Sequence, residues 1–175
     1  SAVCPSINRR QPAESLRRRA VSAGPTRSAL MTGRYTYRLG TQAEIVESYV
    51  PFGIPLRERF MPEHFQAAGF ATAIFGKWHL GFYQRAYTPL HRGFDEHIGY
   101  LTGVIDYFNH SRSAAMGNSG GFCCGGHELN AGLDWNRGNL PPCPADTGKY
   151  TSPLIEAQAV DFLRRQIRAQ KNFFL

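Results

Sequence analysis

The sequence predicts an α/β fold, in which helices alternate with the strands of a parallel sheet, on three observations. A helical segment that ends at Gly69 is followed at once by the short apolar run FATAIF, residues 70–75. A second short strand is predicted within residues 91–100, and a third begins in FFL, residues 173–175, after a long amphipathic segment. The order helix, glycine, buried strand is typical of parallel α/β sheets.

The first predicted helix covers residues 25–34, PTRSALMTGR. Pro25 suits the first helical position because its φ is preset and it gives up only an N–H that would be unpaired there. Gly33 gives the helix a place to end. The free N–H groups at such a helix start attract anions, and Arg27 and Arg34 add fixed positive charge. This segment therefore predicts an anion-binding helix start.

A loop is expected over residues 35–55, and a turn over residues 56–60. A second helix is then predicted from Pro62 to Ala68, closed by a glycine. The next segment, residues 70–75, is rich in strand formers and suits a buried strand.

Lys77 and His79 lie in GKWHLG, directly after that strand. Open α/β sheets bind ligands at the carboxyl ends of their strands. The i, i+2 spacing places both side chains on one side if the segment is extended. Each residue taken alone is more often structural, but the anion-binding helix start upstream favours a site. Asp95 is predicted to be a hydrogen-bonding residue of a turn or sheet edge. The other histidines show no metal-ligand spacing and are expected to be structural or exposed: His64, His91, His97, His110 and His127.

Residues 109–149 are dominated by Gly, Ser, Asn and Pro and predict a long surface excursion, with Trp135 as its one large anchor. Ser152 and Pro153 predict the start of a helix. In that helix Val160, Leu163 and Ile167 recur on one face, while Arg164, Arg165 and Arg168 lie elsewhere. The closing FFL is expected to be a buried strand.

The chain carries 20 basic and 13 acidic side chains, a formal net charge of +7. Five arginines crowd residues 1–22, which predicts a disordered, solvated arm, with polyanion binding as the alternative. The rest of the chain has no basic helix face with interleaved aromatics, so nucleic acid is not an expected partner. No stretch approaches the roughly twenty apolar residues of a membrane span, and no signal-peptide core is visible. Localisation and oligomeric state are not predicted.

The four cysteines are Cys4, Cys123, Cys124 and Cys143. Their spacing fits no zinc pattern. Disulfides are predicted instead, one joining the glycine-rich loop around residues 123–124 to Cys143, which would imply an oxidising compartment.

The motifs PTRSALMTGR, GKWHLG and HRGFDEHIGY occur in this order, and are followed by YTS before a helix and by the closing FFL. From about Pro25 to Leu175, the chain therefore resembles the type I sulfatases of the alkaline-phosphatase superfamily, and most nearly the arylsulfatase B group. The resemblance implies a three-layer α/β/α sandwich, with residues 23–175 as the amino-terminal part of a catalytic domain. It also implies hydrolysis of sulfate esters, with sulfated sugars as expected substrates. Members are usually lysosomal, secreted or periplasmic.

The family signature is C-x-P-x-R, whose cysteine is oxidised to formylglycine, the nucleophile. Pro25 and Arg27 match it, but the cysteine position holds Ala23. An alanine methyl cannot become an aldehyde, so little or no turnover is expected from this chain. By resemblance, Arg27 would brace the formylglycine, Lys77 would bind a sulfate oxygen, and His79 would hydrogen-bond the formylglycine hydroxyl.

Calcium is the cofactor that the resemblance implies. Its family ligands are pairs of acidic and amide or imidazole side chains that do not occur in this chain, so no metal ligand is assigned here. Two alternatives stay open. One is a non-catalytic binder of sulfated polyanions that uses Arg27, Lys77 and the basic arm, and the other is a nucleic-acid binder, which rests on charge alone. A separate hypothesis is that residues 1–22 and Ala23 derive from a mis-assigned exon, which the transcript across that junction tests.

Overall fold

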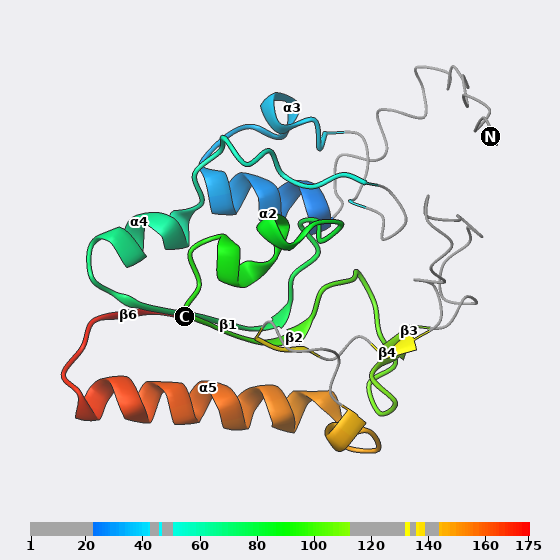
Figure 1. Cartoon of the computed structure of the whole chain (residues 1–175), viewed down its shortest axis with the longest axis vertical. Coiled ribbons are helices and arrows are strands. Elements are labelled where there is room, and N and C mark those ends of the chain that lie inside the picture. The colour runs from blue at the N-terminus through cyan, green and yellow to red at the C-terminus, as the bar shows by residue number, and fades with distance from the viewer. Residues whose placement is uncertain (1–22, 43–45, 47–50, 113–131, 134–135, 139–143) are drawn as a thin grey trace.

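The chain forms three layers in its computed structural model, which describes residues 23–42, 46, 51–112, 132–133, 136–138 and 144–175. A sheet lies between α5 on one face and α2, α3 and α4 on the other (Figure 1). The α-helices are α2 (Ala23–Thr32), α3 (Thr36–Leu39), α4 (Met61–Ala67) and α5 (Thr151–Arg168). The predicted α/β/α architecture is confirmed. The expectations for residues 1–22, Trp135 and the four cysteines lie outside the described residues.

The main sheet has the strand order β5-β2-β1-β6. Its strands are β1 (Ala71–Lys77), β2 (Glu96–Tyr100), β5 (Asn136–Arg137) and β6 (Phe173–Phe174). The central strand β1 is parallel to β2 and to β6, whereas β5 is antiparallel to β2. A separate antiparallel pair joins β3 (Ser111–Arg112) to β4 (Gly132–Leu133). Short 3₁₀ helices are η1 (Arg85–Tyr87), η2 (Pro89–His91) and η4 (Pro144–Asp146).

The strand β5 corrects the prediction that residues 109–149 form only a surface excursion. Asn136 pairs with Gly99, and Arg137 pairs with Ile98. Asn and Arg are not strand formers, so these two residues carry no strand signal. The pairing instead satisfies backbone groups at the outer edge of β2.

The ends of α2 agree in part with the prediction. Gly33 adopts a left-handed φ of 65°, and its N–H donates to the carbonyl of Ala29 at 2.8 Å, so the predicted stop is confirmed. The helix begins at Ala23, however, which makes Pro25 its third residue rather than its first. Proline is tolerated there because the N–H groups of the whole first turn have no partner within the helix.

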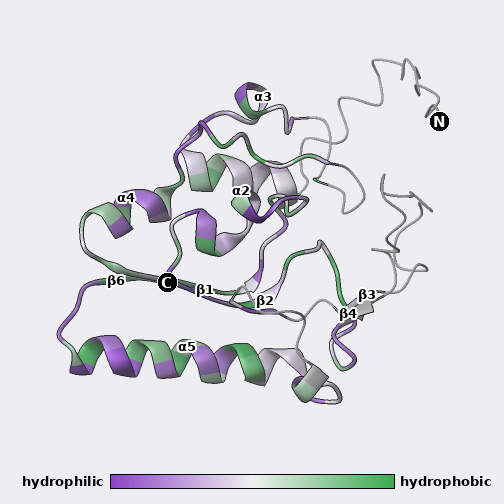
Figure 2. Cartoon of the chain, in the orientation of Figure 1, coloured by the Kyte–Doolittle hydropathy of each residue, from purple (hydrophilic) through white to green (hydrophobic). Residues whose placement is uncertain are grey.

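The apolar face that the sequence indicates on α5 is only partly buried, with Val160 and Leu163 half-buried. Ile167 is 66% exposed, while Phe162 is buried against Ala71 and Ala73 of β1. Apolar and polar residues alternate along this helix in Figure 2, so the sequence offers more than one stripe. The face of α5 that contains Phe162 packs on the sheet because this aromatic side chain has the most apolar area to bury. Tyr150, rather than Ser152, occupies the position before the first helical residue. No helix in the described ranges has the length and apolar content of a membrane span.

The FFL strand is only partly buried. Phe174 stacks on Phe65 of α4 with ring centroids 4.6 Å apart, but Phe173 is 37% exposed. The strand β6 lies at the edge of the sheet, next to β1 only, and an edge strand is covered less completely than a central one.

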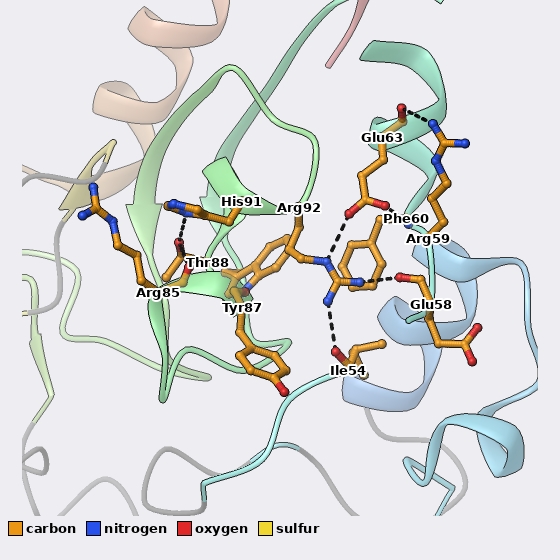
Figure 3. Close-up of polar contacts among 11 residues, drawn as sticks. Ile54, Glu58, Arg59, Phe60, Glu63, Arg85, Tyr87, Thr88, His91 and Arg92 are labelled. Atoms are coloured by element: carbon orange, nitrogen blue, oxygen red, sulfur yellow. Dashed lines mark hydrogen bonds and ion pairs between the residues drawn. The ribbon is translucent and has the colours of Figure 1, made fainter. Parts of the chain in front are cut away.

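A buried arginine joins the segment before β2 to the start of α4. Arg92 is 2% exposed, and its guanidinium lies 3.7 Å from the ring centroid of Phe60. It donates to the carbonyl oxygens of Ile54 at 3.0 Å and Glu58 at 2.6 Å, and pairs with the Glu63 carboxylate at 3.3 Å, as Figure 3 shows. Burial lowers the pKa of Arg92, although the Glu63 carboxylate opposes that shift.

Replacing Arg92 should therefore be costly. Arg92→Met leaves two buried carbonyl groups without their donor and the Glu63 carboxylate without its ion-pair partner, and we expect it to lower the free energy of unfolding by about 3 kcal/mol. Arg165→Met is the matched control, because Arg165 makes exposed ion pairs with Glu96 and Asp161. Urea unfolding of both variants measures the difference, and equal losses would contradict the role given to Arg92.

His97 should make stability depend on pH. It is 2% exposed on β2, and burial lowers its pKa to about 4, with only the Gly76 backbone opposing. The unfolded chain, with an ordinary pKa near 6.5, therefore binds the proton first as the pH falls. The stability due to neutral His97 is complete above about pH 6.5 and falls by up to about 3 kcal/mol as the pH approaches 4. Urea unfolding near pH 7 and near pH 5 measures this change. His97→Leu should flatten the profile, and an unchanged slope would contradict the assignment.

Candidate functional site

The first turn of α2 meets the carboxyl end of β1. The Arg27 guanidinium donates from Nη1 to the backbone carbonyl of Lys77 at 2.9 Å, across 50 residues of sequence. Lys77 is the last residue of β1, which runs two residues beyond the predicted strand at 70–75 and so includes Lys77 in the strand end. The two predicted cationic segments are therefore adjacent in space.

The pairing of these cations has an electrostatic signature. Burial lowers the pKa of Lys77, and the positive charge of Arg27 lowers it further. Within the described ranges, neither cation is matched by a carboxylate. Two neighbouring, partly buried positive charges repel each other, and an anion placed between them would relieve that repulsion. The arrangement therefore suits an anionic ligand.

Trp78 fixes the motif between Lys77 and His79. Its side chain is 1% exposed, and its ring packs on Phe60 and, edge to face, on Phe94, with centroids 5.9 and 6.2 Å away. The indole N–H donates to the carbonyl of Gly81 at 2.9 Å and lies 3.1 Å from that of Tyr87. Because the indole is buried and hydrogen-bonded, the residues on either side of it have little freedom to move.

His79 does not continue the extended strand, which corrects the expectation from its spacing to Lys77. Its backbone is left-handed, with φ of 59°, so the i, i+2 rule for extended chains does not apply. Its N–H donates to the carbonyl of Leu101 at 3.1 Å, and the side chain is buried against the backbone of Gly103. The segment after β2 therefore determines where His79 lies.

Ala23 is the first residue of α2, one helical turn before Arg27. Downstream of it, the buried Ser28 hydroxyl lies 2.8 Å from the carbonyl of Pro25 and 2.9 Å from the Thr41 hydroxyl. These contacts fix the start of α2 to the loop that follows α3. The position that the signature assigns to the nucleophile therefore lies on the same side of α2 as Arg27, one turn before it.

Asp95 is a hydrogen-bonding residue at the sheet edge, as predicted. Its carboxylate accepts from the Thr72 N–H at 2.9 Å, from the Thr72 hydroxyl at 3.0 Å and from the Gln66 amide at 2.7 Å. Partial burial raises the pKa of this carboxyl, but the hydrogen bonds outweigh burial, and the pKa lies below its ordinary value.

Among the described residues, the remaining histidines do not belong to a group of side chains that could hold a metal ion. His97 and His110 are buried, whereas His64 and His91 are exposed. His127 is outside the described residues. Where the structure describes side chains, no group of three or more His, Cys, Asp or Glu residues could hold a metal ion. Arg27 and Lys77 are cations and offer no side-chain oxygen ligand, so they do not fit calcium.

Sequence reasoning missed two residues of this region. Arg92 lies in the motif HRGFDEHIGY, but the sequence does not indicate its burial, since an arginine is rarely buried unless several acceptors converge on it. Gly103 carried no signal, because its contact with the His79 ring joins segments that only the folded chain brings together.

Comparison with known proteins identifies the family. The model of the Sulfatase family matches residues 5–175. Arylsulfatase J of Mus musculus is 36% identical over 118 residues, which cover 65% of this chain and 19% of that protein. N-acetylgalactosamine-6-sulfatase of Canis lupus familiaris is 32% identical over 163 residues, 86% of this chain and 28% of that protein. The crystal structure of Ps i-CgsB superposes with a TM-score of 0.67 at 26% identity, covering 87% of this chain and 33% of the other.

The extent of these matches matters in two ways. The motifs indicate a resemblance only from about Pro25 onward. The family match begins at residue 5, so it also includes most of the segment before Pro25. The chain spans only about a fifth to a third of the length of these relatives. Together with the three-layer fold and the junction of Arg27 with Lys77, the match over nearly the whole chain shows that this protein belongs to the sulfatase family.

Proposed function

We propose that this chain supplies the sulfate-binding cations of a site for sulfate esters, in which Arg27, Lys77 and His79 take the roles that the family motifs assign to them. One observation carries the proposal. The Arg27 guanidinium and the end of β1 are joined at 2.9 Å, and the charge of Arg27 lowers the pKa of Lys77. A sulfuryl group carries negative charge on several oxygens, so it would match two adjacent cations.

Each residue has a distinct chemical task in this proposal. Lys77 binds one sulfate oxygen as a compact charge. Arg27 has five N–H donors, of which one is directed at the Lys77 carbonyl, so its planar fork can also brace the nucleophile position. The family motif gives His79 the task of hydrogen-bonding the formylglycine hydroxyl and accepting its proton, a task that Ala23 leaves unused in this chain. Sulfated sugars are the proposed substrates, since one relative is an N-acetylgalactosamine-6-sulfatase.

Ala23 at the formylglycine position would prevent turnover but leave the binding of sulfate esters possible. The methyl group at the formylglycine position offers no oxygen to attack sulfur, so we propose that this chain binds sulfate esters without hydrolysing them. Calcium belongs to the proposal only through the family resemblance, and its ligands would have to come from residues other than those described. The second candidate, a non-catalytic binder of sulfated polyanions, would use the basic residues of the segment 1–22 in addition to Arg27 and Lys77, and it is favoured by the same alanine.

Sulfate binding should depend on Lys77. Lys77→Ala removes a partly buried charge-assisted contact, and we expect the dissociation constant for a sulfated monosaccharide to rise about tenfold by calorimetry. Lys171→Ala is the matched control, because it removes the same charge from an exposed position beyond α5. Equal affinities for the wild-type chain and Lys77→Ala would refute the assignment of Lys77.

Turnover should be absent. We expect the chain to release no sulfate from an aryl sulfate above the uncatalysed rate, with or without added calcium, because Ala23 is not a nucleophile. Robust calcium-dependent release would contradict this account. Salt-dependent binding of a sulfated glycan without sulfate release would favour the non-catalytic binder, whereas equal binding of DNA would reduce the function to charge alone.

A further inference from the structure

The imidazole of His79 lies against the backbone of Gly103. A Cβ atom added at Gly103 would lie 2.7 Å from Cε1, 2.9 Å from Nε2 and 3.2 Å from Nδ1 of His79. The first two distances are shorter than the contact distance of a carbon with a ring atom. The ring therefore occupies space that is open only because residue 103 has no side chain.

The segment that carries Gly103 also controls the backbone of His79. The His79 N–H donates to the Leu101 carbonyl at 3.1 Å, and His79 has the left-handed φ that non-glycine residues seldom adopt. Thr102 is buried, and its hydroxyl donates to the Val104 carbonyl at 3.1 Å, which restrains the loop around Gly103. Such an outlier conformation persists only where surrounding structure holds it, and it is frequent at functional sites.

We propose that Gly103 is a positioning residue that sets the orientation of the His79 imidazole at the sulfate site. The contact between Gly103 and the ring is independent of the proposed function, but the use of the ring's orientation for sulfate binding rests on it. Gly103 touches neither Arg27 nor Lys77 in this account and acts only through the ring. Because Gly103 has no Cβ, the imidazole can lie directly against its backbone. The hydrogen bond from the His79 N–H to the Leu101 carbonyl fixes the backbone from which the ring extends.

The imidazole, rather than the backbone, would yield to a side chain at position 103. The loop follows directly from β2, whose pairing with β1 continues through hydrogen bonds from Trp78 to Tyr100 and from His79 to Leu101. The ring is the far end of a side chain with two rotatable bonds, so it moves more easily. Gly103 does not adopt the left-handed conformation, so alanine tests the ring contact and not backbone strain.

The experiment compares Gly103→Ala with Val104→Ala in the 175-residue chain. Val104 is 48% exposed in the same loop, which makes it a matched control. Imidazole carbon and nitrogen NMR signals report the His79 ring, and titration with inorganic sulfate reports binding. We expect Gly103→Ala to shift the His79 ring signals, to abolish their response to sulfate and to weaken sulfate binding about tenfold, while Val104→Ala matches the wild type. Unchanged ring signals and affinity in Gly103→Ala would overturn the proposal.

Two further results keep the two proposals distinguishable. If sulfate perturbs neither Lys77 nor His79 in the wild-type chain, the proposed function fails, while the ring signals of the sulfate-free variants still decide whether Gly103 orients the imidazole. If Gly103→Ala does not fold, the double variant Gly103→Ala with His79→Ala removes the ring that causes the clash. Recovery of folding supports the contact, and continued failure to fold overturns it.

Discussion

The arrangement of the site depends on the burial of Trp78. This indole lies between the two polar residues of its motif and packs against Phe60 and Phe94, and the Arg92 guanidinium in turn stacks on Phe60. Removing so large an apolar surface from water is the main favourable contribution available to a segment that otherwise carries a lysine and a histidine. A strand end that would be mobile in isolation therefore becomes a fixed platform for charged groups.

Charge is concentrated on that platform at a cost in electrostatic energy. Lys77 loses hydration and lies near Arg27, and both effects disfavour its ammonium form. The Lys77 carbonyl offsets part of this cost by accepting a hydrogen bond from Arg27, so the same residue attracts the guanidinium through its backbone and repels it through its side chain. The balance leaves a preorganised positive site, which is the state that an anionic ligand stabilises.

Three segments far apart in sequence contribute to the region. The helix α2 brings Arg27, the end of β1 brings Lys77, and the loop after β2 holds His79 in place. Rigid elements on both sides of a strand end position side chains more precisely than one loop could.

The sequence by itself determined the local features of this protein. The strand predicted at 70–75, the glycine that ends α2 and the position of Lys77 at the carboxyl side of that strand follow from apolar runs, backbone freedom and connection order, which are properties of neighbouring residues. The tertiary structure decided the face that α5 buries, the recruitment of β5, the burial of Arg92 and the left-handed turn at His79. Each of these depends on which surface or acceptor lies opposite, and no residue carries that information until distant segments pack together.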